Sequence, residues 1–358
     1  MDVKLFNQLL SAGVKAQASD IHLKAGAPPL FRIDGRLREI KAPKLAPEDT
    51  RTIVQAILDA QAQRKEVDAI QELDTSYLLP EVGRFRVNAF RQRGSFEIIL
   101  RIIPLEVPTF EKLGLPPVLK EISLYERGMV LVTGVTGSGK SSSLAAIVNY
   151  INQNARKHIL TIEDPIEFLH TDLKGSISQR EIGPDTPDFS TALRSALRQD
   201  PDVILVGEIR DAETVDIAIK ASETGHLLLS TLHTTDATHT VNRLIGLFPM
   251  EEQEVVRMRL AESLKAIISQ RLLPRADGKG RVVAAEIMVN TATIADCIRN
   301  SAKTTMIREY IEKGRDQYHM QSFDQHLASL LRSEVITMEI AKASATNPSD
   351  FERALSFE

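Results

Sequence analysis

The sequence predicts an α/β fold: a central domain with a mostly parallel sheet, a smaller α+β domain before it and a helical region after it. Apolar runs of strand length alternate with amphipathic helical patterns between residues 118 and 290, which is typical of a parallel sheet covered on both faces. Residues 1–103 show short strand patterns and tight turns, and residues 291–358 show no strand pattern. Four prolines within residues 104–117 predict a linker.

The first domain is expected to contain an arginine-rich hairpin, because polar and apolar residues alternate on both sides of a turn at Arg93–Ser95. The predicted elements are strands at Asp20–Leu23, Pro29–Ile33, Arg84–Ala89 and Phe96–Ile103, a hairpin with an Asp-Gly turn at Ile33–Leu37, and a helix from Pro47 to about Arg64.

In the central domain, two segments carry residues at positions i, i+3, i+4 and i+7 that would form the buried stripe of an amphipathic helix. One begins at Leu144, and the other begins at Val215 with Asp211 as its N-cap and Gly225 at its end. The strands are predicted at Met129–Thr133, His158–Ile162, Val203–Val206, Leu227–Leu232 and Arg281–Val289.

A phosphate-binding loop joins the first of these strands to a helix. Residues 134–141 read GVTGSGKS and match the pattern G-x-x-x-x-G-K-[ST] in full, between an apolar strand and an amphipathic helix as the motif requires. Glycines let backbone N–H groups converge on the phosphates, and the helix N-terminus adds partial positive charge. Lys140 is expected to reach the β- and γ-phosphates of ATP, and the Ser141 hydroxyl to coordinate Mg²⁺. The predicted nucleotide-binding residues are Gly134, Thr136, Gly137, Ser138, Gly139, Lys140, Ser141 and Ser142.

Carboxylates follow two other predicted strands. Glu163 ends one strand, with Asp164 and Glu167 just beyond it, and Glu208 follows the apolar run Val203–Val206. Ligands of open α/β sheets bind beyond the carboxyl ends of strands, so these acids are candidates for holding Mg²⁺ or orienting the attacking water. Acidic residues at strand ends are also commonly just solvated, and position alone does not decide between these alternatives.

Two histidines flank the strand Leu227–Leu232. His226 precedes it and His233 follows it, and either is a candidate to contact the γ-phosphate or a catalytic carboxylate. A structural role is the more common one for a histidine and remains open for both.

Composition narrows the class of protein. The net charge of -4 shows no overall excess of basic residues of the kind expected in a nucleic-acid-binding protein. The single cysteine excludes an internal disulfide and a multi-cysteine zinc site. No stretch approaches the ~20 apolar residues of a membrane span, and the first residues do not form a secretory signal. We therefore expect a cytoplasmic protein that meets a membrane only peripherally.

Taken together, seven segments resemble the secretion ATPases, and within them the ATPases that power retraction of type IV pili in twitching motility. The resemblance covers nearly the whole chain. The matching segments are Ser19–Leu23, Phe31–Leu37, Arg84–Phe90, the phosphate loop, Thr161–Phe168, Leu197–Asp211 and Gly225–Thr235.

The resemblance implies a homo-hexamer built from a PAS-like N-terminal domain, a RecA-like P-loop core and a helical C-terminal region. It also implies that ATP binds where one subunit's N-terminal domain meets the core of the next. Arg86 and Arg101 match the family's nucleotide-contacting arginines, while Arg198 and Arg210 are weaker candidates for the γ-phosphate or the subunit interface. An arginine delivered in this way stabilises the charge of the transferred phosphoryl group.

Two departures from the family patterns refine the expected function. The paired C-x-x-C motifs of pilus-assembly relatives are absent, which favours retraction. The retraction ATPases carry an A-I-R-N-L-I-R-E motif, and here the first arginine is replaced by Ala295 whereas Arg299 remains. The implied function is a motor that moves an inner-membrane platform protein from the cytoplasmic face, or else an accessory nucleotide-binding subunit that assists a paralogous motor.

Overall fold

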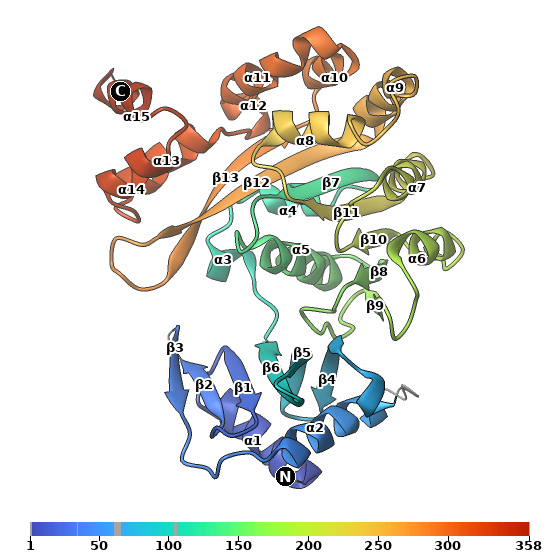
Figure 1. Cartoon of the computed structure of the whole chain (residues 1–358). Helices are drawn as coiled ribbons and strands as arrows, with labels where there is room; N and C mark the ends of the chain where they lie inside the picture. Colours follow the sequence, from blue (N-terminus) through green and yellow to red (C-terminus); the bar gives the residue numbers. More distant parts are fainter. Residues whose placement is uncertain (1, 34, 61–65, 104–105, 358) are drawn as a thin grey trace. The chain divides into compact units, whose positions relative to one another are not determined.

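A computed structural model describes residues 2–33, 35–60, 66–103 and 106–357. The chain divides into two compact units (Figure 1). The first consists of Met1–Glu106 with the short segment Glu167–Leu169, and the second of Val107–Ile166 with His170–Glu358.

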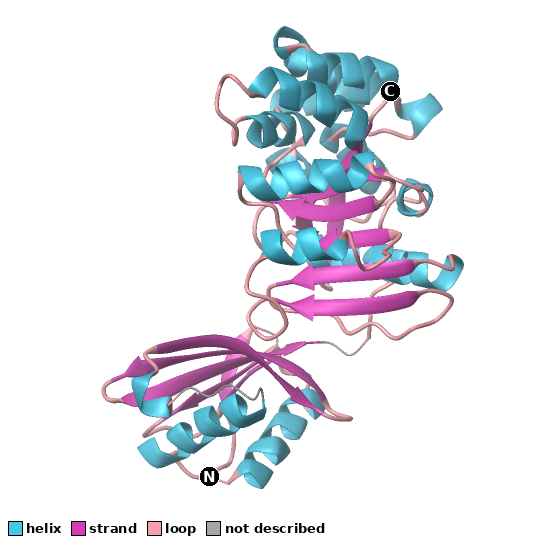
Figure 2. Cartoon of the chain, turned by 90° about the vertical axis from the view of Figure 1, so that its right-hand side faces the viewer, coloured by secondary structure: helices cyan, strands magenta, loops and turns pink. Residues whose placement is uncertain are grey.

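The first unit is an antiparallel sheet with helices on one face (Figure 2). Its strand order is β3-β2-β1-β6-β5-β4, and apolar residues of β1, β5 and β6 bury against Phe6 and Leu10 of α1 and Ile57 of α2. The elements are α1 (Val3–Lys15), β1 (Asp20–Lys24), β2 (Leu30–Ile33), β3 (Arg36–Glu39), α2 (Pro47–Ala60), η1 (Val67–Ala69), β4 (Glu72–Leu79), β5 (Gly83–Gln92) and β6 (Ser95–Ile103).

The predicted strands of this unit and the arginine-rich hairpin β5–β6 are confirmed. Helix α1 and strand β4 were not predicted. The Asp34 half of the predicted Asp-Gly turn, and the predicted end of the helix at residues 61–64, lie outside the described residues.

The second unit is built on a seven-stranded sheet in the order β13-β12-β7-β11-β10-β8-β9. All neighbouring pairs are parallel except β12 and β13, so the predicted parallel sheet is confirmed. The strands are β7 (Gly128–Thr133), β8 (His158–Glu163), β9 (Ser176–Glu181), β10 (Val203–Val206), β11 (Leu227–Leu232), β12 (Leu264–Pro274) and β13 (Arg281–Val289).

Strands β9 and β12 were missed for different reasons. Strand β9 is a polar edge strand, and an edge strand need not carry a continuous apolar run. Strand β12 follows helix α9 (Gln253–Ser263) without an intervening loop, so no turn signal separates the two.

Helices cover both faces of this sheet, as predicted. Met129 and Leu131 of β7 belong to one apolar core, and Val130 and Val132 belong to the other, because successive side chains of a strand point to opposite faces. The covering helices are α3 (Phe110–Leu113), α4 (Val118–Ser123), α5 (Lys140–Asn154), α6 (Phe189–Ala196), α7 (Ala212–Glu223), α8 (Ala237–Ile245) and α9.

The C-terminal region is helical among the described residues, as predicted. Its last part packs against the ends of β12 and β13 around Phe323 and Leu327. The elements are α10 (Ala292–Arg299), η2 (Ser301–Met306), α11 (Ile307–Lys313), α12 (Arg315–Tyr318), α13 (Phe323–Arg332), α14 (Met338–Ser344) and α15 (Pro348–Phe357).

Candidate functional site

The predicted phosphate loop runs from the end of β7 to the start of α5. Gly134 has φ +145°, and a Cβ at that position would lie 2.5 Å from the carbonyl oxygen of Gln270, so only glycine fits. Gly139 precedes the helix with φ +91°, which glycine adopts without strain. The 15-residue helix α5 therefore begins directly after the loop, with the positive end of its dipole at that point.

Lys140 and Ser138 are buried within the loop. The Lys140 ammonium donates hydrogen bonds to the carbonyl oxygens of Gly134, at 2.8 Å, and Val135, at 3.2 Å. The Ser138 hydroxyl is buried without a hydrogen-bond partner among the described residues. Thr136 and Gly137 are exposed at the tip, and Ser141 and Ser142 are half-buried on the first turn of α5. These groups suit a triphosphate, because the Lys140 ammonium lies against the loop and the serine hydroxyls lie at the N-terminus of α5.

Strand β12 packs beside the phosphate loop and is hydrogen-bonded to the elements on either side of it, α5 and β7. This contact was not predicted. The Gln270 side chain donates to the Ser143 hydroxyl at 2.8 Å, and Thr133 donates to the Ser269 hydroxyl at 2.9 Å. All four side chains are buried. The signal in the sequence was the pair of polar residues Ser269 and Gln270 directly after the apolar residues 266–268 of β12.

Four neighbouring strands, β7, β11, β10 and β8, end at the same edge of the sheet. The phosphate loop follows β7, His233 follows β11, Glu208 lies just beyond β10, and Glu163 ends β8. The amide of Gly134 donates to the carbonyl of Leu232, so the loop and His233 leave adjacent strands side by side.

Glu208 contacts two of the predicted residues. Its carboxylate lies 2.7 Å from Nη2 of Arg210 and 3.4 Å from Nε2 of His233. The hydrogen bond and the charge of Glu208 raise the pKa of Arg210, and Asp164 adds to this effect from nearby. The structure thus brings His233 and Arg210 to Glu208, and places Asp164 near Arg210.

Glu163 is oriented by its own strand and the next one. It accepts a hydrogen bond from Thr161 at 2.6 Å and another from Gln179 of β9 at 3.2 Å. Gly207 packs closely beside it, because a Cβ there would lie 3.5 Å from the Glu163 Cα and 3.3 Å from the Ile162 carbonyl oxygen. This close packing keeps the ends of β8 and β10 together.

The structure does not bring His226 or Arg198 to this edge. His226 precedes β11, so it lies at the amino end of that strand, and its Nδ1 is 2.9 Å from the carbonyl oxygen of Ala221 near the end of α7. Arg198 lies in the loop before β10, at the same edge as His226, and its Nη1 donates to the Arg194 carbonyl. The remaining candidate of the acidic segment, Glu167, is exposed and belongs to the first unit.

Arg86 and Arg101 are directly paired across β5 and β6 in the first unit. Like charges opposite each other destabilise a sheet, and here each has a carboxylate partner. Arg86 donates to Asp74 at 3.0 Å, and Arg101 donates to the buried Asp20 at 3.0 Å. Both side chains retain exposure, 40% for Arg86 and 70% for Arg101, and so remain available to an anionic ligand.

Arg91, two residues before Arg93 of this turn, packs within the first unit. The Arg91 guanidinium lies 4.4 Å from the centre of the Phe96 ring, and its Nε donates to the Ile70 carbonyl.

The described residues contain no group of three or more His, Cys, Asp or Glu side chains that could hold a metal ion by themselves. No helix in the described part of the chain is long and apolar enough to cross a membrane.

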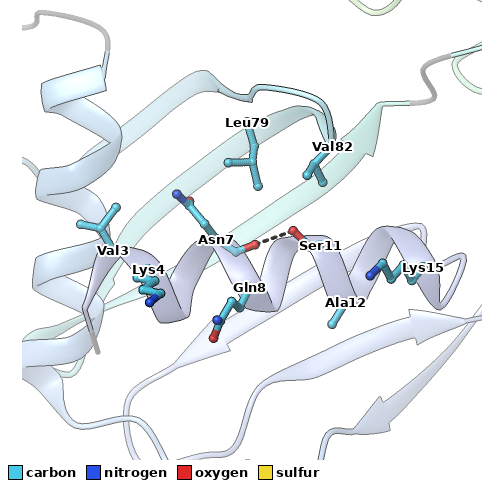
Figure 3. A pocket seen from close by; sticks show the side chains of 9 residues that line it. All are labelled: Val3, Lys4, Asn7, Gln8, Ser11, Ala12, Lys15, Leu79 and Val82. Atoms are coloured by element: carbon cyan, nitrogen blue, oxygen red, sulfur yellow. Dashed lines mark hydrogen bonds between the residues drawn. The ribbon is translucent and has the colours of Figure 1, made fainter.

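A separate groove follows α1 in the first unit (Figure 3). Val3 and the β4–β5 residues Leu79 and Val82 form its apolar side, and Lys4 and Lys15 lie along the helix. It contains none of the predicted site residues.

Comparison with known proteins gives matches over nearly the whole chain. The family model described as "Type II/IV secretion system protein" matches residues 2–353. The type IV pilus retraction ATPase PilT of Pseudomonas aeruginosa is 46% identical over 96% of this chain and 99% of its own length. The type IV pilus ATPase PilU of the same organism is 41% identical over 96% of this chain and 90% of its own length. A crystal structure of the pilus retraction motor PilT with bound ADP superposes with a TM-score of 0.89, at 43% identity over 99% of both chains.

Proposed function

The chain is an ATPase of the type II/IV secretion system protein family, and we propose that it is a motor that powers retraction of type IV pili in twitching motility. The observation that carries this proposal is the arrangement of the phosphate loop, His233, Glu208 and Glu163 on four neighbouring strand ends. It supports hydrolysis as well as binding, because acids and a polar side chain lie where the γ-phosphate of a loop-bound nucleotide would extend.

In the proposed site, the loop amides and Lys140 hold the β- and γ-phosphates of ATP, and Ser141 with an acid would hold Mg²⁺. A bound Mg²⁺ would neutralise charge on the phosphate oxygens. Glu208 and Glu163 are the candidates for orienting the attacking water, and His233 links the first of them to the nucleotide. Gln179 and Thr161 restrain Glu163, and Arg210 and His233 restrain Glu208.

The proposed motor is a homo-hexamer in which Arg86 and Arg101 of one copy reach the phosphates bound by the next. Residues 1–103 would act as a PAS-like domain, moving about the linker 104–117 against the RecA-like core 118–290, with the helical region 291–358 attached. Interface closure around ATP, and reopening on product release, would transmit force to an inner-membrane platform protein. In this proposal the chain works in the cytoplasm, at the cytoplasmic face of that membrane.

The test is phosphate release by the purified full chain with ATP and Mg²⁺. Lys140→Ala should abolish it, whereas Lys279→Ala, in an exposed loop of the same unit, should not. Arg86→Ala should lower kcat by about a hundredfold or more while nucleotide affinity is kept, because an arginine acting on transferred phosphate contributes to the transition state. Arg93→Ala, at the exposed turn of the same hairpin, is the matched control. A chain that stays monomeric with ATP, or an Arg86 variant with unchanged turnover, would count against the hexameric motor.

A second candidate is an accessory subunit that assists a paralogous retraction motor. Ala295 favours it, because this residue replaces an arginine of the retraction motif and is buried on α10. Strong ATPase activity of the chain alone would exclude this candidate. A deletion strain with excess, unretracted pili would establish the main-motor role, and one that retracts normally until a second motor is weakened would establish the accessory role.

A further inference from the structure

The loop that carries His233 is tied to the first turn of α8. The Asp236 carboxylate caps the helix by accepting the His239 amide at 2.9 Å. The Thr240 hydroxyl lies 2.7 Å from that of Thr234 and also donates to the Asp236 carbonyl at 2.7 Å. Residues 234–236, which directly follow His233 in the chain, are therefore connected to the start of α8 at several points, and movement of the helix start would move this loop.

A buried carboxylate from a strand far away in the sequence also accepts a hydrogen bond from the start of this helix. Glu286, on β13, is 5% exposed, and its Oε1 accepts the amide of Ala237, the first residue of α8, at 2.8 Å. Ala237 is fully buried. The first amides of a helix have no partner within the helix, and a carboxylate is favoured there by the helix dipole. Burying a carboxylate is costly, so its presence in a core where an apolar residue would pack calls for a reason beyond packing.

We propose that Glu286 is a positioning residue for the ATPase reaction: by holding the Ala237 amide it fixes the loop 233–236, and so keeps the His233 imidazole against Glu208. The inference rests on the proposed function and on the 3.4 Å contact between His233 and Glu208. The hydrogen bond of Glu286 leads to the backbone of α8, and it is through this backbone that Glu286 acts.

The first test removes the acceptor without emptying its space. Glu286→Met is apolar and of similar size, and Glu286→Gln keeps an oxygen that can accept the Ala237 amide. We expect Glu286→Met to lower kcat by about tenfold or more with the KM for ATP nearly unchanged, because misplacing a catalytic group affects the chemical step more than binding. Glu286→Gln should retain most of the wild-type kcat.

A matched control is the hydrogen bond made by Ala285, the neighbour of Glu286 on β13. His326 accepts the amide of Ala285 through Nδ1 at 2.9 Å, so His326→Ala also breaks a buried hydrogen bond to β13, but one that leads to α13. It should lower stability and leave kcat within about twofold. If His326→Ala and Glu286→Met lower kcat equally, the effect is general to β13 and the proposal is wrong.

A second variant removes the donor instead of the acceptor. Ala237→Pro lacks the amide hydrogen, and the first helical position tolerates proline, especially since Asp236 before it is extended, with φ −158° and ψ 174°. This variant should reproduce the kcat loss even if Glu286→Met does not fold.

A double-mutant cycle tests the route through His233. If Glu286 acts through that imidazole, Glu286→Met should lower kcat further by less than about twofold in a His233→Ala background. Full additivity of the two losses, or wild-type kcat in both Glu286→Met and Ala237→Pro, would overturn the inference. Absence of ATPase activity in the wild-type chain would instead remove the proposed function on which it rests.

Discussion

The buried carboxyl of Glu286 makes the stability of the second unit depend on pH near neutrality. Burial raises the pKa of Glu286 from an ordinary 4.5 to about 7; the Ala237 amide opposes this rise, the charge of Asp236 adds to it, and Arg308 and Arg271 oppose it. Between these two pH values the folded chain binds more protons than the unfolded chain. The free energy of unfolding therefore falls as pH rises from 4.5 to about 7, and the loss is complete above that range.

The magnitude follows from the two pKa values. At 1.36 kcal/mol per pKa unit, keeping Glu286 ionised in the core costs about 3 kcal/mol at pH 8, of which about 2 kcal/mol develops between pH 5.5 and pH 8. Glu286→Gln removes this cost, because the amide side chain is neutral at every pH and still offers an oxygen to Ala237. The variant should gain about 2 kcal/mol relative to wild type between the two pH values.

Urea unfolding followed by circular dichroism at pH 5.5 and pH 8 measures this difference, provided that the denaturant dependence is the same for both chains. Glu262→Gln is the control for removal of a carboxylate, since that side chain is 71% exposed rather than buried. Parallel stability curves for wild type and Glu286→Gln across this range would refute the reasoning. They would mean that water or a nearby cation solvates the carboxylate in the folded chain.

Two further substitutions test the loop and a helix cap. Gly134→Ala should lower nucleotide affinity at least tenfold in a fluorescent-nucleotide titration, because its Cβ would lie 2.5 Å from the Gln270 carbonyl oxygen; Gly137→Ala, whose Cβ meets nothing within 4 Å, should lose less, with a backbone strain of about 1–2 kcal/mol. Equal losses would show that the close contact is not what requires glycine. Asp211→Ala should lower the free energy of unfolding by about 1 kcal/mol, because Asp211 caps α7 by accepting the Thr214 amide at 2.8 Å. Asp211→Asn should retain most of the wild-type stability, because asparagine also caps helices. Identical stabilities in a denaturation series would contradict the cap.

Local patterns in the sequence were enough to predict the phosphate loop and the strand-end acids. The spacing of the glycines indicates the backbone conformation of the loop. The apolar runs before Glu163 and Glu208 indicate strands that are buried on both faces of the sheet. The direction of a parallel strand also separates the two histidines. His233 follows β11 at the edge that carries the loop, whereas His226 precedes it at the opposite edge. That distinction was available in the sequence but was not drawn from it.

The contacts that hold these parts together could not be predicted, because they join residues far apart in the chain. Gln270 reaches Ser143 across 127 positions, and Glu286 reaches Ala237 across 49. Neither pair leaves a local periodicity, since a buried polar residue in a strand looks like an interruption until its partner is known.

The sequence by itself predicted the α/β core and a nucleotide site on its P-loop, because the motif lies within eight consecutive residues and their flanking patterns. Only the tertiary structure shows that Glu208 is the acid in contact with His233, that β12 packs beside the phosphate loop, and that the buried carboxylate of Glu286 accepts the first amide of α8. The physical reason is that strand order and long-range hydrogen bonding are set by the packing of the whole sheet rather than by any one segment.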